Sequence, residues 1–83
     1  MSWKEIIEEK TKAEALTKDF KFPDFISAWA FMSKVALLAE KMDHHPDWSN
    51  SWNKVSISLS THSAGNKITA KDRKLAEEID ALG

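Results

Sequence analysis

Two segments of the chain alternate between apolar and polar residues at a period of two. Residues 16–22 place Leu16 and two phenylalanines on one face and polar side chains on the other. Residues 54–62 place aliphatic side chains and Thr61 on one face, and three serines and His62 on the other. This period is typical of strands that bury one face, so each segment is predicted to be a strand that rests on the core.

Shorter segments give weaker patterns. Residues 3–9 contain two isoleucines flanked by charge and fit a short strand or a helical turn. Residues 47–53 combine serines, asparagines and two tryptophans, which favours a short strand followed by a turn. Residues 63–67 include Gly65 and Asn66, which adopt left-handed backbone readily, and are predicted to be a loop.

Residues 25–42 carry the strongest helical pattern, and Asp24 is placed to cap the first turn. Apolar residues recur at spacings of three and four and form one stripe: Phe25, Ala28, Trp29, Met32, Val35, Ala36, Ala39 and Met42. Phe31, Leu37 and Leu38 lie outside this stripe and narrow the polar face. Because a small sheet covers only one side of such a helix, we expect the flank to contact another subunit.

A second helix is predicted over residues 70–82. Thr69 and Asp72 resemble a capping box with aspartate in place of glutamate. The apolar side of this helix consists of Leu75, Ala76, Ile79 and Leu82. The order strand, strand, helix, strand, strand, helix predicts an α+β fold, a four-stranded antiparallel sheet with helices packed on one face. At this length, residues 1–83 are expected to form a single domain.

Composition removes several classes of function. Lys and Arg total 12 against 13 Asp and Glu, so we do not expect a nucleic-acid interface built on a broad basic face. The absence of cysteine excludes disulfides, thiolate catalysis and cysteine-ligated zinc. The chain has no apolar run near the roughly 20 residues that span a bilayer and no signal-peptide core. We therefore expect a cytoplasmic protein without a membrane partner.

The candidate chemistry lies in three histidines. His44 and His45 follow the long predicted helix, and His62 closes a predicted strand. Imidazole titrates nearer neutrality than any other side chain, so three together would suit proton transfer in both directions. Glu40 lies four residues before His44 and would fix the tautomer of that ring if the last helical turn persists. Pro46 gives the segment an extended path, and His62 would join the pair if its strand end lies beside the helix end.

Other interpretations of these residues stay open. Three histidines can bind zinc, but adjacent histidines lack the spacing that lets two rings chelate one ion, so we expect no metal. Asp72 is explained by helix capping alone. Trp48 and Trp52 are either packing residues or flat surfaces on which a planar heterocycle would stack.

The spacing of these residues resembles the signature of a known family. That signature contains an acidic residue, a His-His-Pro sequence, an aromatic residue, a later histidine and a final aspartate. The residues that match it in this chain are Glu40, His44, His45, Pro46, Trp52, His62 and Asp72. This pattern is similar to that of the pterin-4a-carbinolamine dehydratases, and the similarity runs from about Trp3 to Leu82. Members of that family usually begin with one more helix before the first strand. This chain starts at about the tryptophan that follows that helix, so we expect the helix to be missing.

The resemblance implies a hydro-lyase that dehydrates 4a-hydroxytetrahydrobiopterin, the pterin-4a-carbinolamine, to the quinonoid dihydropterin. This reaction recycles the cofactor of aromatic amino-acid hydroxylases. It requires an acid for the departing hydroxyl and a base for the N5 proton, and it implies no metal and no cofactor. By resemblance, His44, His45 and His62 are the catalytic set. His44 and His62 would lie near the leaving hydroxyl, and His45 would serve binding or deprotonation.

The resemblance also implies a set of substrate-binding residues. Glu40 would orient an imidazole, and Pro46 with Trp48 would shape the slot for the pterin. Asp72 would contact the site loop as well as cap its helix. Hydrogen bonds to the pterin edge are expected from backbone or hydroxyl groups of Asp43, Ser60 and Thr61.

A second function is implied by the same resemblance. Some relatives are dimerisation cofactors of a homeodomain transcription factor, and others act in assembly or regulation. Such a protein-binding module would use the apolar flank around Phe31, Leu37 and Leu38. A homo-oligomer, dimer or tetramer, is expected in either case, and a nuclear location where the co-regulator role applies.

Overall fold

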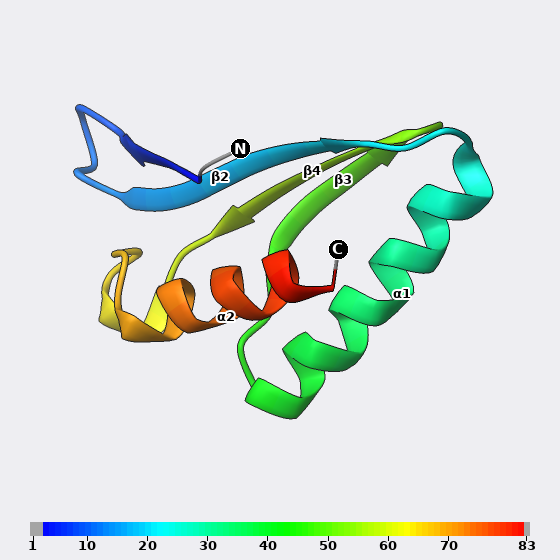
Figure 1. Cartoon of the computed structure of the whole chain (residues 1–83). Coiled ribbons are helices and arrows are strands. Elements are labelled where there is room, and N and C mark those ends of the chain that lie inside the picture. Colours follow the sequence, from blue (N-terminus) through cyan, green and yellow to red (C-terminus); the bar gives the residue numbers. More distant parts are fainter. Residues whose placement is uncertain (1–2, 83) are drawn as a thin grey trace.

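The computed structural model describes residues 3–82, and its elements follow the predicted order. Figure 1 shows the sheet as one layer and the two longer helices as a second layer on one of its faces. The α+β fold is therefore confirmed. In chain order the elements are β1 (Lys4–Ile7), β2 (Glu14–Lys21), α1 (Phe25–Met42), β3 (Asp47–Ser51), β4 (Lys54–Leu59), the short 3-10 helix η1 (His62–Ala64) and α2 (Ala70–Ala81).

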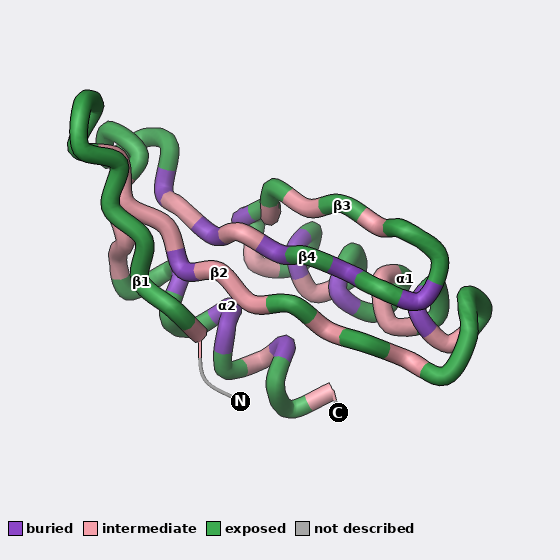
Figure 2. Tube along the Cα trace, turned by 90° about the horizontal axis from the view of Figure 1, so that it is seen from above, coloured by how far each residue is buried: buried purple, intermediate pink, exposed green. Residues whose placement is uncertain are grey.

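The strands form one antiparallel sheet in the order β1-β2-β4-β3. Leu16 of β2 lies opposite Leu59 of β4, and both side chains are buried under the helices. Figure 2 shows buried and exposed positions alternating along β4. At the sheet edge, Asp47 of β3 pairs with Ser58 of β4. This antiparallel register brings the connection that follows α1 beside the connection that follows β4.

Both ends of α1 are fixed by local hydrogen bonds. At its start, the Asp24 carboxylate accepts the Ser27 amide at 2.8 Å, as the sequence predicts for an N-cap. At its end, Asp43 adopts left-handed backbone (φ 49°, ψ 43°), and the amide of His44 donates to the carbonyl of Ala39 at 3.0 Å. This C-cap reverses the chain and turns His44 back across the end of the helix.

The buried face of α1 differs from the predicted stripe. Phe25, Trp29 and Ala36 were expected in the core, but all three are exposed. Phe31 and Leu38, which the pattern assigns to the flank, pack against the core instead. The Phe31 ring lies between two aromatic rings at and just after the end of β2, with centroids 4.8 and 5.0 Å away. This aromatic cluster sets the rotation of the helix about its axis, which periodicity alone leaves open.

The segment after β4 also differs from prediction at one point. The strand ends at Leu59, and His62 begins η1 instead of closing the strand. Thr61 forms an isolated bridge with Lys67, which closes the loop on itself. The turn bends the chain because Gly65 has left-handed backbone, as the sequence predicts.

Helix α2 begins with the predicted capping box between Thr69 and Asp72. Its apolar side packs under the sheet through Leu75, Ala76 and Ile79, which are buried. None of the helices in residues 3–82 combines the length and apolar character needed to cross a membrane.

Candidate active site

All three histidines line one hollow of about 380 Å³, where β3 begins and β4 ends. The connection after α1, the residues after β4 and the first turn of α2 build its walls. The lining consists of Asp43, His44, His45, Pro46, Asp47, Ser60, Thr61, His62, Ser63 and Lys71. This volume is within the range of small-molecule sites. The strand end thus lies beside the helix end, which was the condition for the histidines to form one group.

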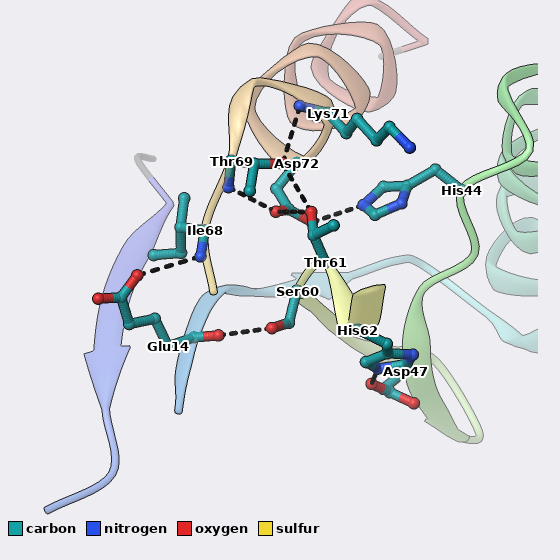
Figure 3. A network of polar contacts seen from close by, with 10 residues as sticks. All are labelled: Glu14, His44, Asp47, Ser60, Thr61, His62, Ile68, Thr69, Lys71 and Asp72. Atoms are coloured by element: carbon teal, nitrogen blue, oxygen red, sulfur yellow. Dashed lines mark hydrogen bonds and ion pairs between the residues drawn. The ribbon is translucent and has the colours of Figure 1, made fainter. Parts of the chain in front are cut away.

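His44 and Asp72 form a buried pair at the back of this hollow. The His44 Nε2 lies 2.6 Å from one carboxylate oxygen of Asp72. The other oxygen accepts the Thr61 hydroxyl at 2.7 Å and the Thr69 amide at 2.8 Å. Figure 3 shows these partners converging on Asp72 from α2, the β4 end and the α1 end. Asp72 therefore both caps its helix and contacts the site.

The electrostatics of Asp72 fix the tautomer of His44. Burial by itself would raise the pKa of the Asp72 carboxyl, which is 0% exposed. Hydrogen bonds from His44, the Thr69 amide and the Thr61 hydroxyl outweigh burial, and the pKa lies below its ordinary value of 3.8. Asp72 is therefore ionised at neutral pH and accepts the proton on Nε2 of His44. Nδ1 is the nitrogen of this ring that is left for a ligand.

Glu40 contacts His45 and not His44. Its carboxylate oxygen lies 2.9 Å from His45 Nε2, and both side chains are exposed. The predicted pairing of Glu40 with His44 is wrong because the left-handed turn at Asp43 removes His44 from the helical path. Glu40 thus contacts the imidazole of His45, the residue after His44.

His62 pairs with a carboxylate that sequence reasoning missed. Its Nε2 lies 3.4 Å from Oδ2 of Asp47, and the two side chains are 65% and 69% exposed. The sequence held a signal for this pair, because the strand and turn predicted over residues 47–53 lead directly into the strand predicted over residues 54–62, and an antiparallel pairing of the two brings residues 47 and 62 to the same end. Lys71 was also missed, and it lines the hollow from the first turn of α2. Helical periodicity does not say which residue of a first turn faces a site.

The remaining predicted residues form the walls or their supports. Asp43 and Pro46 line the hollow directly. Ser60 lines it as well, while its hydroxyl donates to the Glu14 carbonyl at 2.7 Å. The Thr61 hydroxyl is held between Asp72 and the Thr69 hydroxyl, which is 2.6 Å away. The hydroxyls of Ser60 and Thr61 thus bond within the protein.

The two tryptophans lie away from the histidines. Trp48 is absent from the lining, and its half-buried ring packs against the core from β3. Trp52 is 66% exposed at the turn between β3 and β4, at the opposite end of the hairpin from the hollow. The packing interpretation therefore fits Trp48, and neither ring is placed to stack on a ligand among the histidines.

A larger hollow of about 880 Å³ lies between β2, α1 and α2. Three phenylalanines (Phe20, Phe22 and Phe31) and three lysines are among its lining residues, and no histidine is. Its walls offer no group with an ordinary pKa near neutrality, so it is poorly suited to proton transfer. The smaller hollow is the candidate for chemistry.

Each imidazole of the smaller hollow has its own carboxylate partner. Such a paired ring can take up a proton and return it, which is what acid–base catalysis requires. Within residues 3–82, no group of three or more histidine, aspartate or glutamate side chains is arranged to hold a metal ion. The chemistry that these residues themselves support is proton transfer.

Comparison with known proteins gives a consistent family. The family model described as "Pterin 4 alpha carbinolamine dehydratase" matches residues 1–82. A protein of Prochlorococcus marinus (strain NATL2A), assigned by name to this dehydratase, is 59% identical over 81 residues, which cover 98% of this chain and 78% of the relative. A Rhizorhabdus wittichii protein assigned the same name is 55% identical over 69 residues, 83% of this chain and 70% of the relative.

Two solved structures share the fold. A Brucella melitensis protein described as a transcriptional coactivator/pterin dehydratase matches with a TM-score of 0.86 and 43% identity, over 98% of this chain and 81% of its own. A pterin dehydratase-like protein described as a RuBisCO assembly factor in the alpha-carboxysome matches with a TM-score of 0.81 and 26% identity, over 99% of this chain and 89% of its own. With a match over nearly its whole length, the chain belongs to the pterin-4-alpha-carbinolamine dehydratases, a family of hydro-lyases.

Proposed function

We propose that this protein dehydrates 4a-hydroxytetrahydrobiopterin to the quinonoid dihydropterin by general acid–base catalysis in the three-histidine hollow. The observation that carries the proposal is the convergence of His44, His45 and His62 on one hollow of ligand size. Family membership supports the substrate class. The physiological role that follows is recycling of the pterin cofactor of aromatic amino-acid hydroxylases.

The reaction removes water across C4a and N5 of the pterin. The C4a–O bond breaks as an acid protonates the departing hydroxyl, a base takes the N5 proton, and a C4a=N5 double bond forms. One proton is given and one is taken, so the protein ends the cycle with its original number of protons. Groups with ordinary pKa values near neutrality can fill both roles at physiological pH.

His44 is suited to protonate the leaving hydroxyl. When its ring is charged, the proton on Nε2 stays hydrogen-bonded to the Asp72 carboxylate, and the proton on Nδ1 can be directed into the hollow. The buried carboxylate then stabilises the imidazolium and holds its orientation. In this scheme His62 acts with His44 at the hydroxyl, and His45 binds the pterin or removes its N5 proton.

The other residues act on the histidines or shape the walls. Glu40 orients His45, and Thr61 acts on His44 through Asp72. The position of the Trp48 ring gives no support to a role for it in the pterin slot. Walls and main-chain groups toward the pterin edge come from Asp43, Pro46 and Ser60.

The test is stopped-flow measurement of carbinolamine breakdown by wild type, His45→Ala, His62→Ala and the double variant. Each single variant is expected to lower the rate constant by roughly 10²–10⁴, the usual contribution of a general acid or base. Both side chains are exposed, so the fold should be retained, which far-ultraviolet circular dichroism checks. Lys34→Ala, on α1 and outside the hollow, serves as a control with unchanged activity.

Wild-type activity that persists in the folded double variant would refute the histidine mechanism. A crystal soak with a stable pterin analogue provides an independent measurement. Electron density for the bicycle among the three histidines is expected, and density elsewhere alone would contradict the assigned site.

A second function is favoured by one exposed surface. Ile26, Trp29 and Leu37 are 73%, 54% and 74% exposed, and their helical spacing places them on one side of α1. We propose that this outer α1 surface contacts a second subunit in a dimer or tetramer, or another protein partner. The flank predicted from sequence is not available as a whole, because Phe31 and Leu38 pack inward.

A further inference from the structure

We propose that Asp47 is a positioning residue for His62, and that its carboxylate holds the His62 ring with the proton on Nε2 and with Nδ1 directed to the pterin. This inference rests on the proposed function and extends it to a residue outside the family signature. The observation that carries it is the 3.4 Å separation of Asp47 Oδ2 and His62 Nε2 within the lining of one hollow. Figure 3 shows the two side chains beside each other at the end of the hairpin.

The backbone of Asp47 is fixed by the sheet. Asp47 is the first residue of β3 and pairs with Ser58 of β4. Pro46 restricts the backbone of His45 to extended conformations, which fixes the path of the chain into the strand. His62 follows the end of β4 and starts η1, where the Gly65 amide donates to its carbonyl at 3.1 Å. Both backbones are therefore held, and they place the two side chains within reach of each other in the lining of the hollow.

The imidazoles of His44 and His62 differ in how firmly they are held. His44 is buried and fixed by Asp72, with Thr61 behind it. His62 is mostly exposed, and Asp47 is the one carboxylate that pairs with its ring among residues 3–82. A neutral imidazole carries its proton on either nitrogen, and an exposed ring rotates between rotamers within nanoseconds. Without Asp47, only a fraction of His62 rings would present the correct nitrogen to the pterin.

The test is a double-mutant cycle of Asp47→Ala and His62→Ala, measured by stopped-flow carbinolamine breakdown. Asp47→Ala alone is expected to lower kcat about fivefold, the rate equivalent of an exposed ion pair, with KM changed less than about twofold. In the His62→Ala background the same change should have no further effect, because Asp47 acts only through that ring. Asp47→Glu should restore part of the lost rate.

A matched control removes the same charge from the same sheet. Asp19 of β2 lies opposite Ser56 of β4, outside the hollow and without a histidine partner among the described residues. Asp19→Ala should leave kcat unchanged. A fivefold loss in this variant as well would attribute the Asp47 effect to net charge and overturn the proposal.

A second measurement does not depend on activity. Long-range ¹H–¹⁵N spectra of neutral His62 should show the proton mainly on Nε2 in wild type and a mixture of tautomers in Asp47→Ala. An unchanged tautomer, or an equal loss of kcat in both backgrounds of the cycle, overturns the positioning role. If wild type shows no dehydration, the proposed function fails, and the spectra alone still decide whether Asp47 fixes the His62 ring.

Discussion

Asp72 combines a structural and a chemical task in one carboxylate. It accepts the Thr69 amide at the start of α2 and fixes Nε2 of His44. Asp72→Asn keeps the shape of the side chain but removes the charge that selects the His44 tautomer. We expect kcat for dehydration to fall at least about tenfold, because orienting carboxylates of this kind have large effects on activity. The free energy of unfolding should fall by about 1–3 kcal/mol, since a buried charge-assisted hydrogen bond is lost.

A neighbouring cap residue separates the two effects. Thr69→Ala removes the hydroxyl that caps α2 and leaves the contact between His44 and Asp72 in place. It should reduce stability by about 1 kcal/mol in urea unfolding and reduce kcat less than Asp72→Asn does. Equal losses of kcat in these two variants would show that the Asp72 effect comes from helix stability.

The lowered pKa of Asp72 predicts how stability depends on pH. Its hydrogen bonds keep the folded-state pKa below 3.8 against the opposing effect of burial, so the unfolded chain binds this proton more readily. The contribution of Asp72 is therefore present in full above about pH 5 and is lost as the pH falls through the folded-state pKa. Urea unfolding between about pH 7 and about pH 3 should show a weaker loss of stability in Asp72→Asn than in wild type.

The Asp24 carboxylate also makes the free energy of unfolding fall as the pH is lowered. The amide of Ser27 lowers the pKa of Asp24 at the start of α1. Asp72→Asn should therefore reduce the pH dependence without abolishing it. An identical pH dependence in wild type and in this variant would contradict the assigned state of Asp72.

The sequence was sufficient to group the three histidines, which line one hollow, but not to pair them with their carboxylates. The spacing of four residues favours a contact between Glu40 and His44, and the structure pairs His44 with Asp72 instead. Local spacing predicts contacts within a helix, whereas the partner of His44 lies 28 residues away in the chain. Asp47 was missed for a related reason, because its role depends on strand register and not on its neighbours.

The C-terminus of α1 gives a prediction about local structure. Asp43 has left-handed backbone, which a β-branched side chain tolerates poorly and glycine adopts freely. Asp43→Val should lower the melting temperature through a loss of about 1–2 kcal/mol, whereas Asp43→Gly should maintain or raise it. Differential scanning calorimetry of both variants checks this, and an equal melting temperature for the two would contradict the assigned turn.

Bounds of the elements were easier to predict than their orientation. The spacing of apolar residues identified the helix at Phe25–Met42. Pro23 and Asp24 before it and the His-His-Pro sequence after it marked where it begins and ends. The helix has apolar residues on most of its circumference, so periodicity could not decide between Trp29 and Phe31 for the core. In the structure Phe31 faces the core because its ring packs against those of Phe20 and Phe22. The rotation of α1 about its axis therefore depends on contacts between the helix and the sheet, which the sequence of the helix alone does not contain.

The two-layer architecture leaves one side of α1 uncovered by the rest of residues 3–82. The sheet and α2 lie against its inner side, as Figure 1 shows, and large apolar residues remain on the outer α1 surface. If a second copy covers this surface, wild type should sediment as a dimer or tetramer of the 9.4 kDa chain. Leu37→Glu should shift it to the monomer, because association would desolvate the new carboxylate.

Two charge substitutions on the same helix make this result specific. Lys34→Glu lies outside the outer α1 surface and should leave the sedimentation coefficient unchanged. Leu38→Glu would place a charge against the core that Leu38 packs on, so it should lower the free energy of unfolding by several kcal/mol. Leu37 is 74% exposed in the single chain, so Leu37→Glu should remain a folded monomer that unfolds cooperatively in urea. Sedimentation and urea unfolding together therefore separate a lost contact from a lost fold. A wild type that sediments at 9.4 kDa would rule out self-association and leave a different protein as the partner of this surface.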